Sequence, residues 1–351
     1  MLQGPDEAAW YARVGPEHDN MRAAFAHAAA VGDADLALRL VTSMTELAHL
    51  RVSYESADWA ERALDLAPPD HPLVPAAAGA AARGSWNRGD FDRARRLAAR
   101  AGGRPPGPGT GRPGHPGDVL ADVALYEGDV DTALRHYVAE VERARRDADP
   151  VRLVWTLYYV AVCHAVRRDP AAGREAARES VTVAEETRNP TARSMARYAL
   201  GLVLKKSEPD RALALFDEAA ALAANVGNFW WQGIAQMEAA ATRAVHGDPV
   251  AAAREFVEVL DHWERVGDRT QQWLNLRYVV RLLLRLGADA DAATLHRCLL
   301  AAGKPSPLDP DRVDALRERI GADAFAAAGE RAAGLGAPGA VLFARAALVA
   351  A

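Results

Sequence analysis

The sequence predicts an all-α protein, an α-solenoid in which antiparallel helix pairs repeat about every 40 residues and wind into a right-handed superhelix. Three observations predict this fold. Turn-type breaks recur at regular spacing, the apolar residues between them follow helical periodicity, and one position after each break is always small. Half of the 351 residues are apolar, which is enough to bury a core and excludes a disordered chain.

The breaks carry residues that end one helix and begin the next. Glycine accepts the left-handed conformation at a helix end, Asp or Asn caps the free amides of the next helix, and Pro fits its first turn. The first residues of one set of breaks lie 39 or 40 positions apart: Gly89-Asp90, Gly128-Asp129, Arg168-Asp169-Pro170, Ser207-Glu208-Pro209, Gly247-Asp248-Pro249 and Gly287-Ala288-Asp289. A second set lies half a period away: Asp149-Pro150, Asn189-Pro190, Gly227-Asn228 and Gly267-Asp268. The sequence therefore predicts two helices per repeat.

The small position lies five residues after the start of each turn. It is occupied by Ala37, Ala94, Ala133, Gly173, Ala212, Ala252 and Ala292. A larger side chain there would push the paired helix away, so we interpret this column as the point where two helices cross closely. Four residues further on, larger groups return in several repeats, as Val41, Tyr137, Phe216 and Phe256.

These motifs resemble a known family. Gly-Asp-x-x-x-Ala followed by an aromatic resembles the tetratricopeptide repeat, with a longer unit. The strings Glu17-His18-Asp19-Asn20 and Asp268-Arg269-Thr270-Gln271-Gln272-Trp273 resemble the C-terminal sensor region of actinobacterial STAND-type ATPase transcriptional regulators. The resemblance implies a regulatory module that works with a nucleotide-binding regulator module. It leaves open whether an ATPase and a DNA-binding module precede Met1 in the gene or whether the chain is an isolated or truncated product.

The chain is expected to have four parts. These are N-terminal helical repeats over 1–100, a Pro/Gly-rich linker loop over 101–117, regular repeats over 118–303 and C-terminal capping helices over 304–351. We expect the linker to lie on the surface with few contacts, so that its deletion costs little stability. The string Gly107-Pro108-Gly109-Thr110-Gly111-Arg112 lacks the lysine of a phosphate-binding loop.

Composition and motifs favour a non-catalytic protein. The 42 basic and 47 acidic residues give a net charge of −5, and the arginines at 93–100 and 143–146 are interleaved with acidic residues, so no direct nucleic-acid binding is expected. We predict a cytoplasmic chain with no membrane partner and with Cys163 and Cys298 reduced and buried. No HExxH, Cys/His metal spacing or GxSxG motif occurs, so no metal, cofactor or catalytic residue is predicted. Acid–base carboxylate pairs, and with them an enzyme, stay open as an alternative.

The first helix of each pair should line the concave face of the solenoid. Aromatic, Arg and Gln side chains suit a peptide or a small polar ligand. The candidate binding residues in this register are Arg152, Trp155, Tyr158, Ser194, Arg197, Trp231, Gln271, Arg277 and Arg281. We hypothesise a regulatory interaction module that binds a protein or peptide partner there. The alternatives are a small-molecule inducer in the same groove, or aromatics that only pack between helices and arginines that face solvent.

Overall fold

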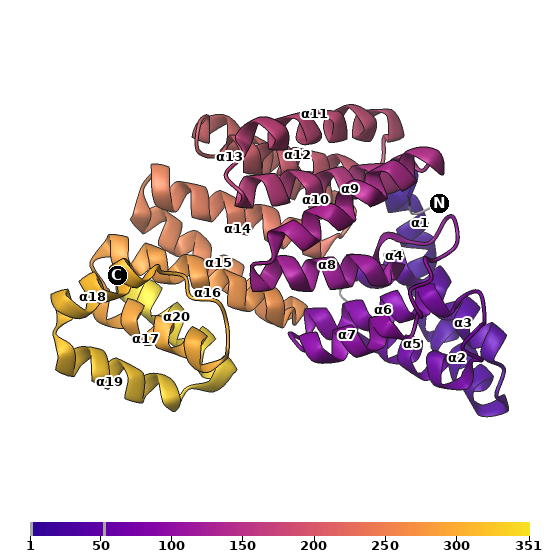
Figure 1. Ribbon diagram of the computed structural model, residues 1–351, viewed down its shortest axis with the longest axis horizontal. Coiled ribbons are helices and arrows are strands. Elements are labelled where there is room, and N and C mark those ends of the chain that lie inside the picture. Colours follow the sequence, from indigo (N-terminus) through magenta and orange to yellow (C-terminus); the bar gives the residue numbers. More distant parts are fainter. Residues whose placement is uncertain (1–2, 52–53) are drawn as a thin grey trace. The chain divides into compact units, whose positions relative to one another are not determined.

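The computed structural model describes residues 3–51 and 54–351, with the backbone alone at 49–51, and within these ranges it contains helices and no strands. The chain divides into two compact units, Met1–Ala235 and Gln236–Ala351. Within each unit, helices that are consecutive in the chain pack against one another in series (Figure 1). The expected all-helical, solenoid-like architecture is therefore confirmed.

Unit 1 contains most of the helix pairs. Its elements are α1 (Glu7–Val14), η1 (Gly15–Glu17), α2 (His18–Val31), α3 (Ala34–Ser43), α4 (Thr45–Arg51), α5 (Tyr54–Leu66), α6 (Val74–Asn87), α7 (Phe91–Ala99), η2 (Arg112–Gly114), α8 (Pro116–Glu127), α9 (Val130–Arg146), α10 (Pro150–Val166), α11 (Pro170–Thr187), α12 (Pro190–Leu204), α13 (Pro209–Asn225) and the first part of α14 (Phe229–His246).

The predicted breaks lie between helices, and local side-chain chemistry explains why. Asp129, Asp149 and Asp169 each accept a hydrogen bond from the amide three residues later, at 3.1, 2.9 and 3.2 Å. Gly128 takes the left-handed conformation that ends α8, with φ of 101°. At the equivalent break before Asp169, Arg168 is forced into that region with φ of 62°. The helix boundaries were therefore predictable from short-range signals.

The column of small residues lies where helices cross. Its six alanines have no exposed surface, and a Cβ at Gly173 would already lie 3.0 Å from Val203. Tyr137, Phe216 and Phe256, four positions further along their helices, are also completely buried. Along the core, points where two helices cross closely thus alternate with large buried side chains, as the sequence indicated.

Unit 2 contains the rest of α14 and six further helices: α15 (Pro249–Val266), α16 (Arg269–Leu286), α17 (Asp289–Ala301), α18 (Pro310–Ile320), α19 (Ala322–Ala333) and α20 (Gly336–Ala350). Helix α19 packs on α17, and α20 packs on α15, α16 and α17. The buried side chains include Phe256, Trp263, Val279 and Leu283. The last three helices therefore cover apolar faces that the α15–α17 series would otherwise expose.

The 101–117 segment differs from the expected surface loop. Only its first part fits that description, since Gly107, Pro108 and Gly109 are exposed. From Gly111 to Pro116 every residue is buried, and Arg112 is 1 % exposed. This part packs on α4 and α6 of unit 1. The expectation of few contacts is therefore wrong for residues 111–116, because a charged side chain in the segment has a buried partner.

No helix in the described ranges is both long enough and apolar enough to cross a bilayer.

Candidate ligand-binding site

A buried carboxylate organises the interior of unit 1 between α8, α9 and α10. Asp118, in the first turn of α8, has no exposed surface. It accepts hydrogen bonds from both terminal nitrogens of Arg152, from Trp155 Nε1 at 2.8 Å and from His136 Nε2 at 2.8 Å. Burial alone would raise the pKa of Asp118, but the charge and hydrogen bonds of Arg152 outweigh it and hold that pKa well below its usual range.

A second carboxylate follows one turn later on the same helix. Asp122 pairs with Arg83 of α6 at 2.6 Å and accepts hydrogen bonds from the hydroxyls of Tyr137 and Tyr159 at 2.6 and 3.0 Å. The two tyrosine rings stack with centroids 4.2 Å apart and planes within 2° of parallel. Burial raises the pKa of Asp122 despite the opposing charge of Arg83. These contacts fix the positions of α6, α8, α9 and α10 relative to one another.

A cavity of about 310 Å³ lies beside this network, between the inserted segment and helices α7, α8 and α9. Its wall includes residues 103–106 of the segment and the polar side chains of His115, His136, Glu140 and Arg143. Arg143 donates to the carbonyl oxygen of Pro106 at 2.8 Å and so ties the segment to α9. The volume is at the lower end of the range of small-molecule sites.

The polar groups of the cavity are held in defined orientations. His136 donates Nε2–H to Asp118, which leaves its Nδ1 as the ring nitrogen for a ligand. A Cβ at Gly117 would lie 2.7 Å from His136 Cε1, so the glycine makes room for this ring position. Burial, assisted by the charge of Arg152, lowers the pKa of His115 to about 3, so its imidazole is neutral at physiological pH. The wall can therefore offer a ligand a ring nitrogen of His136 in a fixed position beside the Arg143–Glu140 pair.

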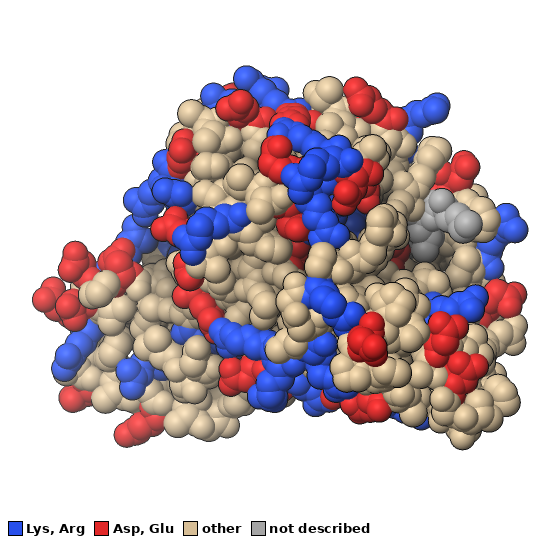
Figure 2. All heavy atoms as spheres, turned by 45° about the vertical axis from the view of Figure 1, so that its right-hand side comes forward, with Lys and Arg blue, Asp and Glu red and all other residues tan. Residues whose placement is uncertain are grey.

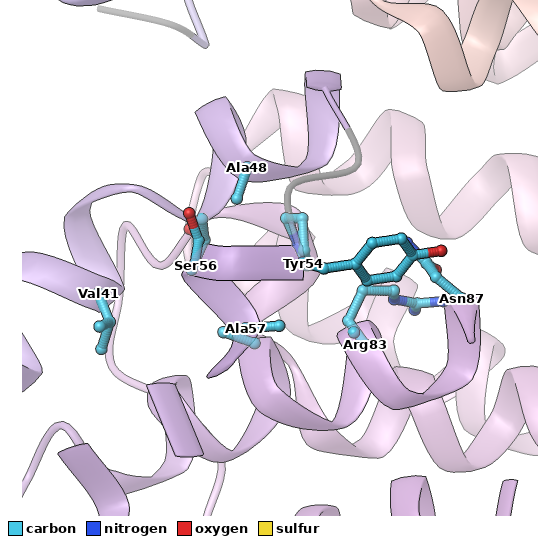
Figure 3. A pocket seen from close by; sticks show the side chains of 11 residues that line it. Val41, Ala48, Tyr54, Ser56, Ala57, Arg83 and Asn87 are labelled. Carbon is cyan, nitrogen blue, oxygen red and sulfur yellow. The ribbon is translucent and has the colours of Figure 1, made fainter. Parts of the chain in front are cut away.

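A smaller pocket lies on the other side of the insertion, where Pro113 contributes to its wall. Figure 3 shows Tyr54, Arg83 and Asn87 on one side of this pocket and Val41 on the other. Its volume of about 30 Å³ is room for one or two water molecules. The pocket is too small for an organic ligand, and the larger cavity is the better candidate site.

All the predicted binding residues of unit 1 except Arg197 lie in its interior. Arg152 and Trp155 belong to the Asp118 network and are 6 % and 1 % exposed. Tyr158 packs edge-on against Trp231 at 4.9 Å between centroids. Ser194 is completely buried and donates to the carbonyl oxygen of Ala219 at 2.8 Å. These side chains face neighbouring helices, as in the alternative in which they pack between helices.

The remaining predicted residues do not line the 310 Å³ cavity either. Arg197 pairs with Glu185 and Glu218, at 2.6 and 3.0 Å. In unit 2, Gln271 is 5 % exposed and Arg277 is half-buried. Arg281 is exposed and donates Nε–H to the carbonyl oxygen of Pro307 at 3.0 Å.

Sequence reasoning missed Asp118, His136, Glu140 and Arg112. One signal was available: Asp118 and Asp122 are charged residues four positions apart in the otherwise apolar helix that follows the insertion, and buried carboxylates need partners. Their partners come from three other helices, and nothing local identifies them.

Many surface arginines are paired with acidic residues. Arg93 contacts Glu61 at 2.6 Å, Arg100 contacts Asp65 at 3.0 Å, and Arg145 contacts Glu179 at 2.6 Å. Basic and acidic side chains lie next to one another over much of the face seen in Figure 2. This interleaving was visible in the sequence.

Among the described residues, no three His, Cys, Asp or Glu side chains are grouped so as to hold a metal ion. No model of a known protein family matches the sequence, and no curated protein matches it.

Proposed function

We propose that this chain is a non-catalytic regulatory module of a cytoplasmic signalling protein and that a small polar ligand binds in the cavity beneath residues 103–117. In this proposal the helix pairs are tetratricopeptide-like repeats of a right-handed superhelix, as the resemblance to STAND-type regulators implies. The observation that carries the ligand part is the 310 Å³ cavity, whose wall brings together His136, Glu140 and Arg143.

The charge states of two groups at the cavity, Asp118 and His115, favour binding over proton transfer. Asp118 is ionised and shared among three donors, and His115 is neutral, so neither exchanges a proton near neutral pH. A ligand that fills the cavity between His136 and Arg143 would contact α9 and also the inserted segment, because both form its wall. Its binding energy would then favour the conformation in which the segment is seated, which is the requirement for a sensor.

Binding of a protein or peptide partner is the second candidate, and a nucleotide-binding regulator module is the partner that the resemblance implies. The serial packing of helix pairs supports it, because such arrays present extended surfaces to other proteins. In unit 1, residues 111–116 already lie against α4 and α6. A partner on this face must therefore compete with the chain's own segment.

The test is a ligand screen with a matched pair of glycine variants. Small carboxylates, amino acids and sugars are screened for thermal stabilisation, and hits are titrated by calorimetry. A ligand at 100 times its Kd should stabilise the fold by about 2.7 kcal/mol. Gly117→Ala should displace His136 and weaken binding at least tenfold. Gly107→Ala, where an added Cβ meets nothing within 4 Å, should bind as the wild type does. Equal binding to both variants would place the ligand elsewhere.

A further inference from the structure

The inserted segment occupies unit 1 in the manner of a bound peptide. Consecutive helices from α9 to α14 are joined by two to four residues, whereas 16 residues separate α7 from α8. The last part of this connection, residues 111–115, crosses α4 and α6, and Arg112 Nη1 reaches Met195 Sδ of α12 at 3.2 Å. Its backbone is extended at both ends, with ψ of 148° at Gly111 and 104° at His115.

Arg112 is the anchor of this segment. Its Nη2 lies 2.7 Å from Glu46 Oε2, its Nε lies 3.1 Å from both Glu46 oxygens, and its backbone amide donates to Glu46 Oε1 at 2.6 Å. Glu46 also accepts from Gln3 at 3.1 Å. A two-pronged contact to a buried carboxylate selects the planar guanidinium over an ammonium group.

Two further features make the pocket a receptor for arginine. Glu7 of α1 is completely buried and is held by Thr191 of α12 and by Asn189, which caps that helix. It is close enough for the charge of Arg112 to act on it. Backbone packs on backbone beside the anchor, because a Cβ at Gly79 would lie 2.3 Å from the carbonyl carbon of Gly114. The site therefore fits Arg-Pro-Gly in a single 3-10 turn with extended residues on either side, and a Cβ at the glycine position would lie 2.7 Å from the Thr110 side chain.

We propose that the Glu46 pocket of unit 1 is a binding site for an arginine-containing, Pro/Gly-flanked segment of a partner protein, and that residues 110–116 occupy it as an intramolecular competitor. The proposal rests on the regulatory function proposed above and specifies its partner. The exposed residues Gly107–Gly109 would allow Arg112 to move out of the pocket while the segment stays attached to α7. A tethered segment acts at millimolar effective concentration, so a free peptide must be concentrated or the tethered anchor removed before exchange occurs.

The experiment uses the full chain and a labelled peptide with the sequence of residues 109–116, Gly-Thr-Gly-Arg-Pro-Gly-His-Pro. Binding is measured by fluorescence anisotropy to the wild type, to Arg112→Ala and to Arg112→Ala combined with Glu46→Gln. We expect the Arg112→Ala chain to bind at least tenfold more tightly than the wild type, and the double variant to lose that gain. A peptide with Gln in place of Arg should bind none of the chains. If folded Arg112→Ala gains no affinity, or if the Gln peptide binds equally, the proposal is wrong.

A second measurement covers the case in which Arg112→Ala does not fold. Hydrogen exchange of the Arg112 amide is followed in the wild-type chain with millimolar peptide. The Arg peptide should accelerate exchange at least threefold and the Gln peptide should not, because only the former displaces the anchor from Glu46. Unchanged exchange with the Arg peptide overturns the proposal. Small-ligand binding in the cavity is measured separately, so persistence of that binding without peptide binding would reject this inference alone.

Discussion

Gly79 and Gly114 lie in direct backbone contact although they belong to a helix and to an inserted segment. A Cβ on Gly79 would be 2.3 Å from the carbonyl carbon and 2.4 Å from the carbonyl oxygen of Gly114. The absence of a side chain in the middle of α6 is what allows residues 111–116 to seat. Three of the four predictions concern this segment, and one concerns the helix crossings.

Gly79→Ala should destabilise the fold by about 2 kcal/mol or more. The usual effect of this substitution inside a helix has the opposite sign, because Ala stabilises a helix by about 1 kcal/mol relative to Gly. At position 79 the substitution destabilises because the clash is with backbone, which cannot rotate away. Urea unfolding measures it. Gly15→Ala is the control, because Gly15 has helical φ of −53° and nothing within 4 Å of an added Cβ. Equal stabilities of the two variants would contradict the seating of the segment.

Ala133→Leu or Ala212→Leu should overpack a helix crossing and cost about 1–3 kcal/mol. Both alanines are completely buried. Ala139→Leu, at an exposed position of α9, should change the free energy of unfolding by less than about 0.5 kcal/mol. A tolerated leucine at position 133 or 212 would show that the column of small residues is not a close crossing.

Acid should destabilise the wild type through Glu46. Burial would raise the pKa of this carboxyl, but Arg112 outweighs it and lowers the pKa to about 2 from the ordinary 4.5. The folded-state pKa is depressed, so the stabilising contribution is complete above about pH 4.5 and is lost as the pH falls toward 2; it amounts to about 3 kcal/mol. Chemical unfolding at a series of pH values should show a shallower acid dependence in Glu46→Gln by about that amount. Parallel pH curves would exclude the ion pair.

Deleting residues 103–114 should unfold the chain or cost more than about 3 kcal/mol, because it leaves Glu46 buried without Arg112. Deleting only the exposed residues Gly107–Gly109 should cost less than about 1 kcal/mol. Thermal unfolding of the two deletion variants, followed by circular dichroism, measures the two losses of stability. The sequence alone predicted that this deletion would cost little stability. If the chain without residues 103–114 is stable, that prediction is right and the segment is a surface linker.

The sequence by itself determined the helices and their ends. Asp129 and Asp149 cap the helices that follow them, and Ala133 and Ala212 mark close crossings, because capping and helical periodicity act within one or two turns.

Only the tertiary structure decided which groups meet. Arg112 and Glu46 are 66 positions apart, and Asp118 and Trp155 are 37 apart. Whether such residues touch depends on how several helix pairs stack, and no local preference encodes that geometry. The same stacking buried Trp155, Tyr158 and Trp231 among helices, and it opened a cavity beneath a segment that its glycines and prolines had marked only as a break in the repeat.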